Sequence, residues 1–153
     1  MNLAKAIYYN SIAPENISQL ILNIIKGFED TKLRSLNYFD LFIIIAFYSY
    51  RPAQEQFQSI KFTPINIFQR DIERNPDIFS NFIFQYEKSI NHIKLGTMYA
   101  LDKEYIVMDE NMNITINKKF KSDNNIIFNM GKVFSTKSTA SLYNFFKVDI
   151  NVI

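Results

Sequence analysis

The sequence predicts a single, mainly α-helical domain that carries one β-hairpin, an α+β fold. Apolar residues recur at helical spacing along most of the chain, and this spacing changes to strict alternation between residues 105 and 117. A chain of 153 residues, of which 48% are hydrophobic, is long enough for one domain with its own core. Because the chain has no cysteine, that core must form without disulfides or Cys-ligated metals.

The first helix is expected from about residue 14 to residue 29. Its buried face is a stripe at helical spacing, made of Ile17, Leu20, Ile21, Ile24, Ile25 and Phe28. Pro14 and Glu15 suit the first turn, and Gly27 lies near the end of the helix. Residues 30–37 are polar and are predicted to form a connector to the next helix.

A second helix is expected at residues 38–50, in the centre of the domain, because this segment is apolar nearly all round. Arg51-Pro52 is predicted to end it, since the residue before a proline avoids the helical conformation. The run from Phe39 to Tyr50 is the most apolar in the chain, but it includes Asp40 and is shorter than the ~20 residues of a membrane span. We therefore expect no membrane contact.

Two further helices are each predicted to open on a capping residue followed by proline. Thr63-Pro64 precedes a helix at residues 64–74, and Asn75-Pro76 precedes a longer one at residues 76–100. The stripe of the longer helix consists of Phe79, Phe82, Ile83, Tyr86, Ile90 and Ile93. Its aromatic residues, which include Phe84, are interpreted as core or partner interface and not as a platform for stacking bases.

A β-hairpin is expected at residues 105–117. The β-rich run from Tyr105 to Met108 leads to the polar turn 109–111, and apolar and polar residues then alternate from Met112 to Asn117. Two more helices are predicted at residues 123–136, after the capping residues Ser122 and Asp123, and at residues 139–146. A long helix that leads into a hairpin is how a winged helix-turn-helix domain ends, so the predicted fold is winged-helix-like.

The residue types exclude several chemistries. His92 is the single histidine, so it cannot build a multi-histidine metal site, and we expect it to be structural or exposed. Three glycines are too few for a Gly-rich phosphate loop, and the chain has no thiol nucleophile. Acidic pairs such as Asp109-Glu110 are adjacent and do not face each other. We therefore predict no catalytic residue, cofactor or metal, and, since no secretory signal is visible, a cytoplasmic protein.

Positive charge is concentrated near the C-terminal end. Residues 111–153 carry six basic and two acidic side chains, whereas residues 1–110 have a small acidic excess. Lys118, Lys119 and Lys121 directly follow the predicted hairpin. On a wing these lysines could contact DNA phosphates, which require positive charge but no base-specific geometry. The simpler interpretation is a solvated charged run at a strand end, so the three lysines are candidate contacts to DNA or to a partner.

Several short sequence steps, taken in order along the chain, carry a resemblance to a known family. The N-terminal ones are Ala13-Pro14, Lys26-Gly27-Phe28, the apolar run Phe42–Tyr50 with Arg51-Pro52, Asn75-Pro76-Asp77-Ile78 and Leu95-Gly96. The C-terminal ones are Gly131-Lys132-Val133-Phe134, Ser138-Thr139, Leu142-Tyr143 and Phe146-Lys147-Val148. In this order the chain resembles the middle component of three-component ABC-ATPase systems, the group that includes the Lamassu antiphage systems.

The resemblance implies a non-enzymatic adaptor subunit in a bacterial antiphage or anti-plasmid defence complex. Its partners would be an SMC- or Rad50-like ABC ATPase and an effector, often a nuclease, with DNA reached through the complex. The alternative is a stand-alone winged-helix DNA-binding regulator, whose readout helix needs Arg, Asn or Gln for base edges. The helix at residues 76–100 offers Gln85, Asn91 and Lys94 but no arginine, which favours the adaptor.

Overall fold

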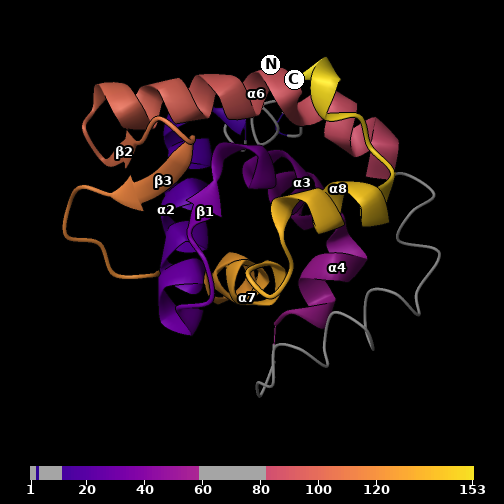
Figure 1. The fold of residues 1–153 in the computed structure, drawn as a ribbon, viewed down its shortest axis with the longest axis horizontal. Helices are drawn as coiled ribbons and strands as arrows, with labels where there is room; N and C mark the ends of the chain where they lie inside the picture. Colours follow the sequence, from indigo (N-terminus) through magenta and orange to yellow (C-terminus); the bar gives the residue numbers. More distant parts are fainter. Residues whose placement is uncertain (1–2, 4–11, 59–81) are drawn as a thin grey trace.

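The computed structural model describes residue 3 and residues 12–58 and 82–153 of the chain. In these ranges the helices are α2 (Pro14–Thr31), α3 (Tyr38–Tyr48), α4 (Arg51–Gln56), α6 (Phe82–Asp102), α7 (Asn125–Phe134), α8 (Thr139–Phe146) and the 3-10 helix η3 (Ile150–Val152). The strands are β1 (Leu36–Asn37), β2 (Ile106–Met108) and β3 (Asn113–Ile116). The fold is mainly helical with a small antiparallel sheet (Figure 1), which confirms the predicted α+β class.

The helices α2 and α3 form where the apolar spacing predicts them. α2 begins at Pro14 and ends just beyond the predicted boundary, where Lys32 adopts a left-handed conformation with φ 55°. α3 begins with a capping box: the Asn37 side chain accepts a hydrogen bond from the backbone N–H of Phe39, and the Asp40 side chain accepts one from the backbone N–H of Asn37. The box fixes the direction in which the chain enters its central helix.

The step Arg51-Pro52 differs from its prediction as a helix end. α3 stops at Tyr48, and the short helix α4 begins at Arg51. Proline is tolerated in the first turn of a helix because its missing N–H would have no intrahelical partner there. The predicted helix at 64–74 and residues 76–81 of the next one lie outside the described residues; the remainder of that helix is α6.

The last two helices also form close to their predicted positions. α7 begins at Asn125 and is capped by the side chain of Asn124, which accepts a hydrogen bond from the backbone N–H of Ile127, and not by Ser122 or Asp123 as predicted. α8 occupies the predicted residues 139–146, and the Ser138 side chain caps it.

The sheet contains one strand more than the predicted hairpin. β2 and β3 pair in antiparallel fashion as the alternation predicts, with Ile106 opposite Ile116. The strand β1 lies within residues 30–37, which were predicted to be a connector, and its Leu36 pairs with Ile114 to give the order β1-β3-β2. A strand of two residues is too short to show an alternating pattern, so its sequence contains no signal for it.

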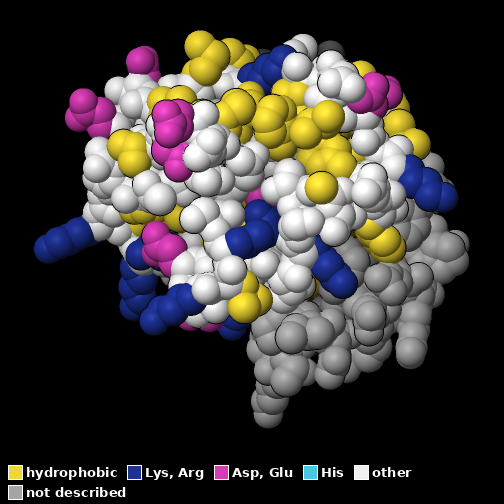
Figure 2. All heavy atoms as spheres, in the orientation of Figure 1, with side chains coloured by type: hydrophobic (Ala, Val, Ile, Leu, Met, Phe, Trp, Pro, Cys, Tyr) yellow, Lys and Arg dark blue, Asp and Glu magenta, His cyan; other side chains and the backbone are white. Residues whose placement is uncertain are grey.

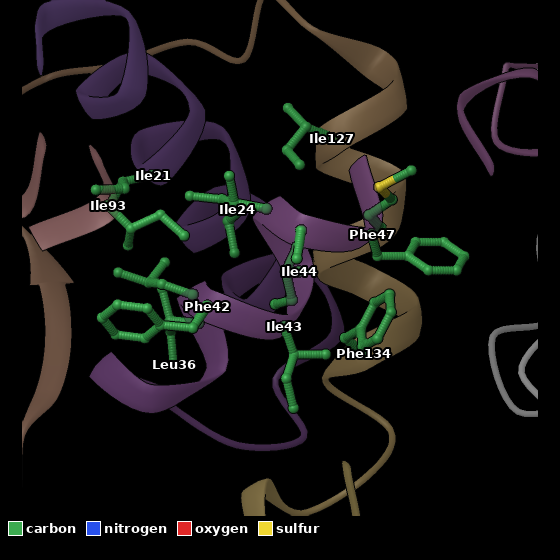
Figure 3. Close-up of a cluster of buried hydrophobic side chains, with 14 of the residues drawn as sticks. Ile21, Ile24, Leu36, Phe42, Ile43, Ile44, Phe47, Ile93, Ile127 and Phe134 are labelled. Atoms are coloured by element: carbon green, nitrogen blue, oxygen red, sulfur yellow. The ribbon is translucent and has the colours of Figure 1, made fainter. Parts of the chain in front are cut away.

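The core surrounds α3. All residues from Asp40 to Phe47 are buried, and α6, α7 and α8 contact the helix on different sides. Figure 3 shows isoleucine and phenylalanine side chains of α2, α3, α6 and α7 that meet around it. The ring of Phe47 lies 5.4–6.1 Å, centroid to centroid, from the rings of Phe57, Phe134 and Phe146. These tilted ring contacts join four helical segments at one point.

All three glycines lie at helix–helix contacts. Gly27 of α2 faces Gly131 of α7, and a Cβ added at Gly131 would lie 2.6 Å from the carbonyl oxygen of Ile24. A Cβ at Gly27 would collide with the carbonyl oxygen of Phe128, and one at Gly96 of α6 with the Ile17 side chain of α2. The glycines therefore permit a close approach of α2 to both α7 and α6.

A buried ionic network joins α3 to the segment between α7 and α8. The carboxylate of Asp40 has no exposed surface and accepts two hydrogen bonds from the Arg34 guanidinium, at 2.7 and 3.0 Å, and one from the Thr139 hydroxyl at 2.8 Å. Arg34 also donates to the carbonyl oxygen of Lys137 at 2.6 Å. The buried Asp40 carboxylate is thus hydrogen-bonded to the partly exposed Arg34 guanidinium and to Thr139, and the Arg34–Asp40 pair connects three parts of the chain.

Candidate partner and nucleic-acid interface

The three predicted contact lysines lie in the connector between β3 and α7. Lys119 and Lys121 are exposed, as expected for residues that could contact phosphates. Lys118 is half-buried, and its Nζ lies 3.7 Å from the centre of the Tyr105 ring. In this cation–π contact the Lys118 ammonium group packs against the Tyr105 ring and does not extend into solvent as a free cation. The lysines therefore separate into two exposed cations and one that packs on the domain.

The surface around Lys121 carries both signs of charge. A shallow depression beside it is lined by Lys26 and Lys32 of the α2 end and by Glu29 and Asp30. Lys26 lies 3.4 Å from Glu29, and the neighbouring Lys132 of α7 lies 3.1 Å from Asp30. Figure 2 shows basic side chains with acidic ones among them over the lower left of the molecule, where the connector runs. Sequence reasoning missed Lys26 and Lys32, because only the fold brings the α2 end to this connector.

The outer face of α6 is a second candidate surface, and it is largely apolar. Phe82 and Tyr86 are buried, whereas the exposed hydrophobic side chains of this helix are Ile83, Phe84, Leu95, Met98 and Leu101. Phe84 and Met98 each keep 63% of their surface exposed, and Leu95 keeps 52%. Figure 2 shows hydrophobic side chains over the upper part of the molecule, where α6 lies in Figure 1. We call the face that carries Phe84, Asn91 and Met98 the outer face of α6.

His92 lies at a pocket on the side of α6. The pocket has a volume of about 390 Å³, and Ile17, Ile45 and Ile93 form apolar parts of its lining. Its polar lining includes His92 together with Gln85 and other side chains of α6. Within residues 12–58 and 82–153, no group of three or more His, Cys, Asp or Glu side chains could bind a metal ion.

Two buried tyrosines contribute hydrogen bonds to the interior of the domain. The hydroxyl of Tyr143 in α8 donates to the carbonyl oxygen of Phe39 at 2.6 Å, and that of Tyr86 in α6 donates to the carbonyl oxygen of Asp149 at 3.1 Å. Burial raises the pKa of both phenols, and the neighbouring Tyr86 raises that of Tyr143 further. At neutral pH both therefore remain protonated donors.

No protein-family model, curated protein or solved structure matches this chain significantly. In the described part of the chain, no helix has both the length and the apolar character that crossing a membrane requires.

Proposed function

We propose that this chain is a non-enzymatic adaptor subunit that bridges an SMC- or Rad50-like ABC ATPase and an effector, often a nuclease. The complex would act in bacterial defence against phages or plasmids, as the resemblance to the middle component of three-component ABC-ATPase systems implies. The single observation that supports it most is the apolar outer face of α6.

The residue types on the outer face of α6 favour a contact with protein over a contact with DNA. α6 leads directly into the β2–β3 hairpin, so α6 would be the readout helix if the chain were a winged-helix DNA-binding protein. A readout helix presents polar or basic side chains to the edges of bases. The outer face of α6 presents Phe84, Leu95 and Met98 instead. Aromatic residues and methionine are enriched in the cores of protein–protein interfaces, so this face suits a protein partner.

Several residues that carry the family resemblance lie inside the domain, where they are used for packing and hydrogen bonding. Gly27 and Gly131 allow the close crossing of α2 and α7, and Gly96 allows the contact of α6 with α2. Thr139 donates to the buried Asp40, and Tyr143 donates to Phe39. These residues serve packing and hydrogen bonding. Proteins that share the pattern at these positions would therefore share the fold, and their surface residues would determine which partners they bind.

Co-purification with the ATPase tests the proposal. We expect an SMC-like ATPase gene beside the gene for this chain, and co-expressed ATPase should be retained by the tagged chain. Replacing Lys118, Lys119 and Lys121 together with Glu should leave ATPase retention intact and reduce DNA retention by the assembled complex, because phosphate contacts depend on positive charge. Loss of ATPase retention in this triple variant would instead place the lysines in a protein interface.

The alternative function is a stand-alone winged-helix DNA-binding regulator. The strand order β1-β3-β2, the hairpin directly after α6, and the exposed Lys119 and Lys121 beyond it favour this alternative. DNA binding by the isolated chain distinguishes the two functions. The adaptor should bind DNA weakly, without sequence preference and with steep salt dependence. Tight, sequence-specific binding that persists in high salt would replace the adaptor with the regulator.

A further inference from the structure

We propose that the pocket beside His92, called the His92 pocket below, binds a neutral nitrogen heterocycle of the adenine type, such as the base of adenosine. The pocket lies between α6 on one side and residues of α2, α3 and α4 on the other, and the outer-face residues Phe84, Asn91 and Met98 do not line it. The inference concerns a small-molecule ligand, so it goes beyond the proposed adaptor function and does not depend on it.

The size and the floor of the His92 pocket suit a flat ring. Its volume of about 390 Å³ falls within the range of about 300–1,000 Å³ that is usual for small-molecule sites. Ile17 of α2, Ile45 of α3 and Ile93 of α6 line it and are 4% exposed or less, so these core side chains form an apolar floor. Such a floor packs against the face of a ring and leaves the ring edges to hydrogen-bonding groups.

The charges around the His92 pocket favour a neutral ligand. Among the described lining residues, Lys88 alone carries a permanent charge, and its Nζ lies 5.7 Å from the centre of the Phe84 ring. Because Phe84 belongs to the outer face of α6, this cation–π contact places the charge at the rim of the pocket. An ion buried without an opposite charge is unfavourable, so a neutral molecule fits this lining better than an anion or a cation.

The α3–α4 side of the His92 pocket offers mainly hydrogen-bond acceptors. The Ser49 hydroxyl donates its hydrogen to the carbonyl oxygen of Ile45 at 2.9 Å, and the Gln54 amide donates one of its hydrogens to the carbonyl oxygen of Tyr48 at 2.7 Å. A hydroxyl that has donated its hydrogen keeps its lone pairs, and Gln54 keeps its side-chain carbonyl oxygen. This side can therefore accept a hydrogen bond from an N–H of the ligand.

The α6 side of the His92 pocket offers both donors and acceptors. In the described part of the chain, neither the Gln85 amide nor the His92 imidazole has a hydrogen-bond partner. The Ser89 hydroxyl donates to the carbonyl oxygen of Tyr86 at 3.1 Å and so adds a further acceptor. A ligand for this side must therefore carry a donor and an acceptor next to each other along one edge.

Adenine matches both sides of the pocket. A glutamine amide can bind N7 and the 6-amino group of adenine together through two hydrogen bonds. Gln85 can thus hold this edge, His92 can donate to another ring nitrogen, and Ser49 or Gln54 can accept the second amino hydrogen. Guanine presents two acceptors, O6 and N7, along the same edge, so the Gln85 carbonyl oxygen would have no partner there.

Titration of the untagged full-length chain with adenosine is the first test, because His92 is its single histidine and gives the only imidazole signal in an NMR spectrum. At constant pH this signal should shift saturably, with a midpoint at or below about 1 mM, as expected for a ligand of this size. Guanosine and uridine should bind at least about tenfold more weakly, because their edges do not match Gln85. An unmoved His92 signal in adenosine, or equal midpoints for the three nucleosides, would overturn the inference.

Two matched amide substitutions on α6 test the role of Gln85. Gln85→Leu should weaken adenosine binding about tenfold or more, because it removes both hydrogen bonds at nearly constant side-chain volume. Asn91→Leu removes an amide from the exposed outer face of the same helix and should leave the midpoint unchanged. Equal adenosine midpoints for Gln85→Leu and the wild-type chain would contradict the assignment of Gln85 to the base.

Substitutions that fill the pocket test its location. Ser89→Leu places a larger side chain at a half-buried lining position and should abolish the shift of the His92 signal, while the circular dichroism spectrum stays unchanged. Ser49→Leu obstructs the pocket from the opposite side, at an exposed position, and should have the same effect if Ser89→Leu disturbs the fold. Adenosine binding that survives in the folded variants would place the site elsewhere and overturn the inference.

The charge of the ligand is tested with adenosine 5′-monophosphate and inorganic phosphate. The nucleotide should bind no more tightly than adenosine, and phosphate alone should neither shift the His92 signal nor displace adenosine, because the pocket presents no buried cation to an anion. A nucleotide that binds about tenfold more tightly than adenosine, or displacement of adenosine by phosphate, would assign the site to an anion and overturn the neutral ligand.

Discussion

The crossing of α2 with α7 and the outer face of α6 are both helix surfaces of this domain, but they differ in where their partner lies. At the crossing, Gly27 and Gly131 bring two backbones together, and the partner is another helix of the same chain. On the outer face, Phe84 and Met98 project outward with 63% of their surface exposed. These exposed hydrophobic side chains on one helix face are the feature on which the proposed protein contact rests.

This difference predicts how substitutions divide between stability and association. Changes at the α2–α7 crossing and at the buried network of Arg34 and Asp40 should lower the free energy of unfolding. Changes on the outer face of α6 should alter binding and leave the fold intact. The distinction fails if changes at the α2–α7 crossing alter binding, or if changes on the outer face of α6 lower the free energy of unfolding.

The largest effect is expected from Asp40→Ala. It leaves the Arg34 guanidinium, whose side chain is 21% exposed, without its carboxylate, which should lower the free energy of unfolding by about 3 kcal/mol. Asp30→Ala is the matched control, because the Asp30 carboxylate is 52% exposed where it meets Lys132. Its loss should cost at most about 1 kcal/mol. Equal effects of the two variants in denaturant unfolding would show that the buried network does not stabilise the fold.

A smaller effect of the same kind is expected from Gly131→Ala. Alanine normally stabilises a helix interior relative to glycine by about 0.5–1 kcal/mol. Here the new Cβ would lie 2.6 Å from the carbonyl oxygen of Ile24, so α2 and α7 must separate, at a cost of about 1–3 kcal/mol. Asn125→Ala, an exposed change at the start of the same helix, is the control. A rise in the thermal midpoint of Gly131→Ala would contradict the close crossing.

The stability should also decline at alkaline pH because of Tyr143. Its pKa is raised in the folded state by burial, whereas in the unfolded chain it has the ordinary value of 10.0. The stability that it contributes is thus complete below pH 10 and is lost progressively as the pH rises above that value. The slope should approach about 1.4 kcal/mol per pH unit. Tyr143→Phe should flatten the decline measured between pH 10 and 11; an unchanged slope would assign it to other groups.

The smallest effect on stability is expected from Met98→Glu. The side chain is mostly exposed in the isolated domain, so its replacement should change the free energy of unfolding by no more than about 0.5 kcal/mol. Phe47→Ala, at a fully buried ring, is the contrasting change and should cost about 3–5 kcal/mol. If Met98→Glu destabilises the chain as strongly as Phe47→Ala, the outer face of α6 belongs to the core.

Within the described residues, the local patterns of the sequence predict the hairpin and most of the helices. The stripe from Ile17 to Phe28 predicts α2, and the alternation after Met112 predicts β3. Features that depend on distant residues were not predictable in this way. The strand β1 exists only because β3 lies beside it, and Gly27 meets Gly131 only after the chain has folded.

The candidate surfaces show the same limit. The run of lysines after the hairpin is visible in the sequence, but the stacking of Lys118 on Tyr105 depends on the geometry of the hairpin. The outer face of α6 was hidden because its helix carries apolar residues on both sides, as Tyr86 and Phe84 illustrate. Periodicity alone does not distinguish the buried stripe of such a helix from the exposed one.

Oxidation of Met98 in the assembled complex tests most directly whether the outer face of α6 is covered by protein. Met98 is 63% exposed in the isolated domain, and the fully buried Met130 provides an internal control in the same chain. Oxidation follows exposure. We predict that Met98 reacts slowly in the wild-type complex and rapidly in the Leu95→Glu chain, while Met130 reacts slowly in both. Equally rapid oxidation of Met98 in the wild-type complex and in the variant would contradict the assignment of this face to protein contact.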